Sequence, residues 1–215
     1  MNAAASSGAL KSFSGVELQG AGAVTNHFAG MVNAMFVNAN VYSYAGDPEK
    51  TKISYIEFAP GAFYPIDKQR KMIVELYGGY GVGHVRNEYD LSSNSIVKFG
   101  KVFIQPNVGF KSRYFDIAFV PKVSFVNWKL VSTHFPAGVN SSTATELMQI
   151  QSEKRFTAFE PAIVTRVGYE LVKIQFTHSF SHPSKEQLSN LMETYTSSIG
   201  IHIDLGVWNK LKSKK

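Results

Sequence analysis

The residues whose types could support catalysis lie close together in the last quarter of the chain. His178 and His182 are followed by Ser184, and Glu186 and Glu193 come shortly after them. A histidine, a serine hydroxyl and an orienting carboxylate can form an acyl-transfer triad, in which the histidine takes the proton of the serine. Brought together in space, these residues would make the protein an acyl hydrolase.

Two features of the same segment argue against a triad. Pro183 lies between His182 and the serine, and the run Ser184–Gln187 has the pattern of a helix capping box, which uses the serine hydroxyl. In an extended strand, His178 and Ser179 point to opposite faces. We therefore expect no catalytic residue, and the sequence favours a protein that is not an enzyme.

Metal, phosphate and thiol chemistry have even less support. The chain contains no cysteine, which excludes disulfides, thiol catalysis and cysteine-type zinc sites. The glycine-rich run 78–83 has strand character and opens no helix, so it does not have the context of a phosphate loop. The other histidines are scattered singly, at His27, His84, His134 and His202. We expect no metal and no cofactor.

Composition indicates a single folded domain with few charges. The chain has 215 residues and a formal net charge of +6, and charged residues make up 18%, against about a quarter in a typical domain. No apolar run approaches the ~20 residues of a membrane-spanning helix. Basic residues are mixed with acidic ones, which argues against nucleic acid as a partner. We expect one domain, 1–209, followed by a basic tail, 210–215, with Lys210, Lys212, Lys214 and Lys215.

A period of two dominates the chain and predicts strands with one apolar and one polar face. In 195–208 the odd positions are mainly apolar and the even positions mainly polar or small. Similar alternation predicts strands at 101–111, 115–125 and 172–181, and in weaker form at 52–64, 70–86 and 155–168. Two further segments, 16–25 and 28–42, have a less regular pattern, and residues 3–7 fit a short additional strand.

Short and long connections alternate between these segments. Tight turns are expected at 25–27, 65–69, 112–113 and 167–168, and long connections at 43–50, 87–96, 131–154 and 182–194. The pattern predicts about ten strands, with both chain ends on the side of the short turns. This organisation is typical of a closed antiparallel up-and-down transmembrane β-barrel with short periplasmic turns and long extracellular loops.

Periodicity alone does not say which face points inward, because a soluble barrel would bury the apolar face. Small residues interleaved with opposite charges on the polar face favour a narrow wet lumen, and therefore an apolar face in lipid. Aromatic residues near the expected strand ends favour the same choice, since girdles of such residues mark the membrane interfaces. These aromatic residues are Tyr64, Tyr80, Phe115, Trp128, Tyr169 and Tyr195.

The polar face carries the candidate functional residues, a lumen-facing network of five acids and five bases. These residues either form salt bridges that fill the lumen or line a selective polar pore. A ten-stranded barrel is only slightly wider than the eight-stranded kind that side chains fill. The network consists of Glu57, Glu75, Lys101, Lys111, Asp116, Lys122, Glu160, Arg166, Lys173 and Asp204.

Four prolines do not fit uninterrupted strands. Pro60, Pro106, Pro121 and Pro161 lie within apolar series, where each removes a ladder hydrogen bond. They mark either β-bulges or strands that begin later than the pattern indicates. Short helices are expected in two of the long connections, at 143–150 and 184–192.

Four runs of the chain resemble small Bacteroidetes-type outer-membrane β-barrel proteins. They are LQGAGAVTNHF at 18–28, ELYGGYG at 75–81, FIQPNVG at 103–109 and SIGIHIDLG at 198–206. The resemblance implies export to the outer membrane of a Gram-negative cell, often with a lipidated cysteine upstream. Residues 1–8 have neither the basic nor the apolar region of a signal peptide. We expect either a cytoplasmic protein or a chain that begins after a removed signal, and the strand pattern favours the second. The chain contains no cysteine, so a lipid anchor would belong to a preceding segment. It ends in lysines, whereas many such barrels end in an aromatic residue.

The sequence therefore predicts a non-enzymatic integral outer-membrane β-barrel, porin-like in architecture. We expect a structural or accessory subunit of a larger assembly, with outer-membrane lipid and other outer-membrane proteins as partners. One alternative is a narrow pore for ions or small solutes. Others are a lipid-modifying acyl hydrolase that uses His182 and Ser184, and a soluble barrel that binds an apolar ligand.

Overall fold

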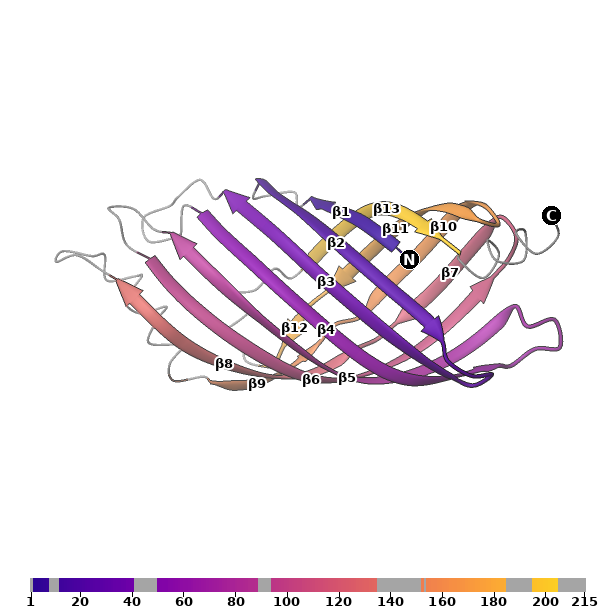
Figure 1. Cartoon of the computed structure of the whole chain (residues 1–215), viewed down its shortest axis with the longest axis horizontal. Coiled ribbons are helices and arrows are strands. Elements are labelled where there is room, and N and C mark those ends of the chain that lie inside the picture. The colour runs from indigo at the N-terminus through magenta and orange to yellow at the C-terminus, as the bar shows by residue number, and fades with distance from the viewer. Residues whose placement is uncertain are drawn as a thin grey trace.

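The chain folds as an all-β protein. The structure is a computed structural model that describes residues 2–7, 12–40, 50–88, 94–134, 152, 154–184 and 195–204. Its strands form one antiparallel sheet that curls around an interior (Figure 1). The strands are β1 (Asn2–Ser7), β2 (Ser12–Ala23), β3 (Phe28–Asn40), β4 (Lys50–Pro65), β5 (Met72–Glu88), β6 (Asn94–Lys111), β7 (Phe115–Val120), β8 (Val123–His134), β9 (Arg155–Phe159), β10 (Ala162–Tyr169), β11 (Val172–Phe180), β12 (His182–Pro183) and β13 (Tyr195–Ile203).

Neighbouring strands in the sequence are mostly neighbours in the sheet. β1 to β6 pair successively, and β1 also pairs with β13. From β13 the pairing continues through β11 and β10 to β7, and β7 pairs with the last residues of β6. β8, β9 and β12 extend the sheet from the first part of β6.

Three of the four expected tight turns are confirmed, and the fourth was placed wrongly. Short connections join β2 to β3, β4 to β5 and β6 to β7 as expected. The turn predicted at 167–168 lies instead at 170–171, after Gly168 has paired with Lys173 in the ladder. A Cβ on Gly168 would lie 2.5 Å from the carbonyl oxygen of Val172, so close approach of the next strand, combined with a φ of +158°, requires glycine.

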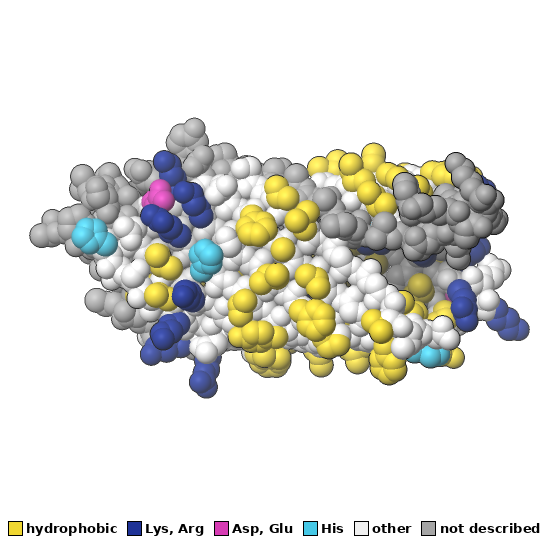
Figure 2. All heavy atoms as spheres, in the orientation of Figure 1, with side chains coloured by type: hydrophobic (Ala, Val, Ile, Leu, Met, Phe, Trp, Pro, Cys, Tyr) yellow, Lys and Arg dark blue, Asp and Glu magenta, His cyan; other side chains and the backbone are white. Residues whose placement is uncertain are grey.

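Side-chain burial alternates along the strands: the outer face is mainly apolar, whereas the inner face combines polar and charged side chains with small apolar clusters. The buried polar and charged residues are Glu57, Asn87, Ser95, Lys101, Gln105, Asp116, Ser124, Lys173 and Gln175. The outer face carries large exposed apolar side chains, among them Leu18, Val32, Phe58, Leu76, Val102, Ile104, Ile117, Phe119, Ile163, Ile174, Ile199 and Ile201. Figure 2 shows hydrophobic side chains gathered across the middle of the visible face.

Two prolines lie at breaks between strand segments, and the same face of the sheet points inward before and after each break. Pro121 lies between β7 and β8, and Pro161 lies between β9 and β10. At these breaks, Lys122 and Glu160 exchange a pair of backbone hydrogen bonds, with N···O distances of 3.2 and 2.7 Å. Even-numbered residues face inward on both sides of each break. The breaks therefore interrupt the ladder but preserve the two faces.

The other two prolines lie inside strands, beside local gaps in pairing. On β4, the register with β5 passes from Phe58 to Gly61, so Pro60 has no partner there. On β6, the pairing with β8 ends at Ile104 and the pairing with β7 begins at Val108, which leaves Pro106 between them. Each missing proline N–H thus falls where no ladder bond is formed on that side.

Inward-facing glycines on β4 and β5 lie against aromatic rings. Gly61 pairs with Tyr77, and Gly79 pairs with Phe103. A Cβ on Gly79 would lie 2.4 Å from Cζ of Phe103 and 2.6 Å from the carbonyl oxygen of Phe58. The glycines of the polar face, expected where the interior is narrow, therefore leave room for rings.

The aromatic residues expected near strand ends differ in their position along the strand and in the face on which they lie. Tyr64, Phe115, Tyr169 and Tyr195 are exposed near strand ends, but Tyr80 lies in the middle of β5. Trp128 faces inward and makes an edge-to-face contact with Phe156, with ring centroids 5.1 Å apart. The assignment of Trp128 to an outer girdle was wrong, because it shares the even, inward series of Ser124 and Val126.

Several expectations concern residues outside the described ranges. They are the helix at 143–150, almost all of the helix at 184–192, and the boundary between the domain 1–209 and the tail 210–215. In the described part of the chain, no helix combines the length and the apolar character needed to cross a membrane.

Candidate functional site: ion pairs inside the sheet

Four of the predicted network residues meet inside the curled sheet. Glu57 on β4 accepts a hydrogen bond from Nζ of Lys122 at 3.0 Å and forms an ion pair with Lys101 on β6 at 3.7 Å. Lys101 in turn lies 3.4 Å from the carboxylate of Glu160. We call Glu57, Lys101, Lys122 and Glu160 the central ion cluster. With two acids and two bases it is electrically neutral. It links β4 and β6 to the strand breaks at Pro121 and Pro161.

Neutral side chains also donate hydrogen bonds to the carboxylates of Glu57 and Glu160. The side-chain amide of Asn33 donates to Glu57 at 2.6 Å, and the hydroxyl of Tyr55 also hydrogen-bonds to Glu57. The hydroxyl of Ser124 hydrogen-bonds to Glu160. The side chain of Glu57 is only 2% exposed, so these bonds replace water around a buried charge.

Each of the two lysines of the cluster has an aromatic ring close to its ammonium group. Nζ of Lys101 lies 4.7 Å from the ring centre of Tyr55, and Nζ of Lys122 lies 4.7 Å from that of Phe103. An ammonium group is attracted to the negative face of an aromatic ring at such distances. Each lysine is therefore bound by carboxylate and ring together.

A second group of predicted residues lies near the turn between β6 and β7. Nζ of Lys173 donates to the carboxylate of Asp116 and to the carbonyl oxygen of Ser112, both at 2.6 Å. Asp116 also accepts the backbone N–H of Ser112 at 3.1 Å. Lys111 forms an ion pair with Asp204 at 2.6 Å, but its side chain is half exposed at the end of β6. We call Lys111, Asp116, Lys173 and Asp204 the turn-end group.

The remaining two network residues bind amides. Glu75 accepts a hydrogen bond from Asn107 at 2.9 Å, and Nε of Arg166 donates to Gln175 at 2.8 Å. The ten predicted residues thus divide between two ion-paired groups and two amide contacts. Sequence reasoning did not identify Asn33, Tyr55 or Ser124, although each shares the inward series of its strand.

Outside the sheet, an exposed ion pair lies on the turn side. Nε of Arg113 lies 3.0 Å from the carboxylate of Glu170, and the guanidinium group also hydrogen-bonds to Tyr169. The nearby charge of Glu170 raises the pKa of Arg113. This pair links the β6–β7 turn to the β10–β11 turn.

His178 and Ser184, two of the residues considered for catalysis, have other partners, and His182 lies opposite Phe159 in the ladder between β12 and β9. Nδ1 of His178 lies 2.7 Å from the hydroxyl of Tyr195. Ser184 binds the backbone of Thr157 twice: its hydroxyl accepts the N–H at 3.2 Å, and its own N–H donates to the carbonyl oxygen at 2.7 Å. Glu186 and Glu193 lie outside the described residues. As expected, His178 is exposed whereas Ser179 faces inward.

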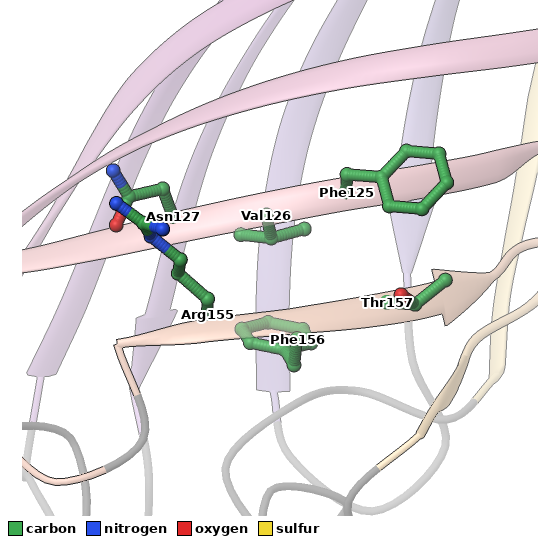
Figure 3. Close-up of a pocket in the computed structure, with 6 residues that line it drawn as sticks. All are labelled: Phe125, Val126, Asn127, Arg155, Phe156 and Thr157. Carbon is green, nitrogen blue, oxygen red and sulfur yellow. The ribbon is translucent and has the colours of Figure 1, made fainter.

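A hollow of about 310 Å³ lies between β8 and β9. Figure 3 shows its described lining, which is Phe125, Val126, Asn127, Arg155, Phe156 and Thr157. Arg155 is the only ionisable side chain among these six, so the lining offers no acid–base pair. In the ranges that the structure describes, no cluster of three or more histidine, aspartate or glutamate residues could hold a metal ion.

The charged groups of the central ion cluster are paired with one another. In the central ion cluster each carboxylate is engaged by lysine and hydroxyl groups, and each lysine is engaged by a carboxylate. Comparison with known proteins adds no family assignment, since no protein-family model matches the chain and no curated protein matches it significantly.

Proposed function

We propose that this protein is a closed, ten-stranded β-barrel of the bacterial outer membrane that acts as a structural or accessory subunit. In this proposal its outer face contacts lipid, its interior is filled by side chains, and it performs no catalysis. The resemblance of its strand motifs to small Bacteroidetes-type barrels is part of the proposal.

The pairing of β6 supports closure. β6 pairs with β5 along one edge, and its last residues pair with β7 along the other. From β7 the pairing continues through β10, β11, β13 and β1 to β2. Counting each strand that is broken at Pro121, Pro161 or Ser181 as one gives ten. A closed sheet leaves no unpaired edge, which a hydrocarbon environment requires.

The single observation that carries the membrane proposal is the inverted burial. Glu57 and Lys173 are 2% exposed in their side chains, whereas Ile104 and Leu76 are each 53% exposed. In water the burial of charges and the exposure of so many large apolar side chains would both be unfavourable. In lipid the outer face is favourable, and a polar interior is the ordinary arrangement.

The side chains that meet inside the sheet support an accessory role over conduction. The central ion cluster extends from β4 to the breaks of the opposite strands, and aromatic rings pack beside it. Barrels of this size have interiors that side chains can fill. A larger partner would then supply any transport or binding activity of the assembly.

Fractionation of cells that express the chain naturally tests this function. We expect the protein in the outer-membrane fraction, released only by detergent, and migrating with other proteins on a native gel. Recovery in the soluble fraction would refute a membrane barrel. Migration alone, together with discrete conductance steps that Glu75→Gln reduces, would replace the accessory role by a pore.

A charge on the outer face gives a sharper test of the lipid environment. Ile104 lies on β6 between Lys98 and the β6–β7 turn, and Val24 is 80% exposed in the turn after β2. We expect Ile104→Arg to lower the free energy of unfolding in vesicles by about 2–4 kcal/mol, as for arginine near the bilayer midplane. The control Val24→Arg should change it by less than about 0.5 kcal/mol. Equal tolerance at both positions would contradict burial of the outer face in lipid.

A further inference from the structure

A row of cations crosses the outer face of five strands that are adjacent in the sheet. Each strand from β4 to β6, and also β8 and β9, carries an exposed basic residue that points outward at the same level. We call this row the basic stripe; it consists of Lys52, Arg86, Lys98, Lys129 and Arg155.

The register of the strands makes the basic stripe continuous. Lys52 lies directly opposite Arg86, and Lys98 lies directly opposite Lys129. Arg86 is opposite Ile96, two residues from Lys98. Arg155 is opposite Asn127, which places it diagonally from Lys129. Diagonal neighbours lie about 7–8 Å apart, within reach of long side chains.

The stripe has too few counter-ions within the described residues. Glu88 lies 3.7 Å from Lys52 and 3.5 Å from Nε of Arg86. In the same part of the chain, no carboxylate lies within ion-pair distance of Lys98, Lys129 or Arg155. Like charges directly opposite each other destabilise a strand pair. An external anion would remove this repulsion.

The basic stripe borders the apolar outer face on the side of the long connections. On β5 the outward series passes from Val82 through His84 to Arg86, and on β6 it passes from Ile104 through Val102 to Lys98. Figure 2 shows lysine and arginine side chains beside the hydrophobic band at this end. In a membrane barrel this boundary lies at the level of the lipid head groups.

We propose that the basic stripe binds the phosphate groups of anionic lipids in the membrane leaflet nearest the long connections. This inference rests on the proposed membrane function. The guanidinium groups of Arg86 and Arg155 suit bidentate phosphate contacts, and the lysines between them act as point charges. Only a lipid phosphate is held at this depth by its own acyl chains.

Lipid titration of the full-length protein tests the proposal. The protein is folded into phosphatidylcholine vesicles with increasing fractions of phosphatidic acid, and thermal unfolding gives the apparent lipid affinity. The variant Lys98→Gln/Lys129→Gln removes two charges from the stripe. The matched control Lys68→Gln/Lys71→Gln removes two exposed charges from the turn between β4 and β5. We expect the stripe variant to bind roughly thirtyfold more weakly, and the control to change less than about threefold.

The outcomes separate this inference from the function on which it rests. Failure to insert into either vesicle type would refute the membrane barrel. If the protein inserts but its stability is the same at every fraction of phosphatidic acid, lipid binding by the basic stripe is refuted and the membrane barrel is not. Equal losses of lipid affinity in both variants would refute it in the same way. Inorganic phosphate forms a further arm in phosphatidylcholine vesicles: stabilisation equal to that by phosphatidic acid would overturn the assignment to lipid. A lipid effect that weakens with added sodium chloride supports the proposal.

Discussion

The two sides of the curled sheet are built differently. One side, β2 to β6, consists of unbroken strands of 12 to 18 residues, with glycines and aromatic rings interlocked on the inner face of β4 to β6. We call it the continuous wall. The other side, β7 to β12, consists of segments broken at Pro121, Pro161 and Ser181. We call it the interrupted wall.

The difference shows how one sheet can combine an apolar exterior with internal charges. Long strands keep the outward series apolar over many residues, and their inner glycines allow rings to lie flat against the wall. The breaks occur where Lys122 and Glu160 point inward. Glu57 of the continuous wall then binds Lys122 of the interrupted wall, so the central ion cluster holds the two walls together.

Removal of the Glu57 charge should have the largest effect on this link. We expect Glu57→Gln to lower the free energy of unfolding by about 3–5 kcal/mol, because Lys122 and Lys101 lose a buried counter-charge. Urea denaturation measures this change.

A partially exposed ion pair provides the control for that prediction. Glu88 contacts Lys52 and Arg86, but its side chain is 33% exposed. We expect Glu88→Gln to lower stability by less than about 1 kcal/mol. The double variant Glu57→Gln/Lys122→Met should recover part of the Glu57→Gln loss. Additive losses at Glu57 and Lys122 would show that the walls do not meet through this pair.

Crowding of the continuous wall should have an intermediate effect. An alanine Cβ at Gly79 would lie 2.4 Å from Cζ of Phe103 and 2.7 Å from Cβ of Ala59. We expect Gly79→Ala to lower the free energy of unfolding by about 1–3 kcal/mol. At Gly22 no neighbouring heavy atom lies within 4 Å of such a Cβ, so Gly22→Ala should leave stability unchanged or slightly higher. Equal effects of the two substitutions would mean that the rings do not constrain this wall.

Loss of a proline from the interrupted wall should have the smallest effect. Lys122 and Glu160 form backbone bonds across the break, so the break does not depend on Pro121 alone. We expect Pro121→Ala to lower stability by about 0.4–1 kcal/mol, through the greater freedom of the unfolded chain. The urea midpoint measures the loss. If stability decreased as much as in Glu57→Gln, the proline and not the backbone bonds would determine where Lys122 lies.

Most strand positions could be predicted because the period of two is a local property of the sequence. The inward position of Glu57, Lys101 and Lys173 follows from it directly. Trp128 was assigned to the interface because it is aromatic, but the same alternation, continued beyond residue 125, agrees with its observed inward position. The turn near 168 was misplaced because a glycine serves close packing in a strand as well as reversal in a turn.

The pairing of charges across the interior could not be predicted. Glu57 and Lys122 are 65 residues apart, and their contact depends on the curvature of the sheet and on two strand breaks. Alternation identifies the face of a residue, but it carries no information about the strand that lies opposite. The prolines were visible as irregularities, yet their alignment with Lys122 and Glu160 emerges only when the strands are paired.

The pairing of β1 with β13 has a consequence for the order of folding. Asn2 lies opposite His202, so this ladder joins segments at nearly the greatest separation that the chain permits. Such non-local ladders form slowly, because a long loop must close before any bond is gained. Until residues 195–203 are in place, β1 and β11 each present an unpaired edge that can recruit other strands. A chain in which residues 195–203 are not yet in place is therefore open to association with strands of other molecules.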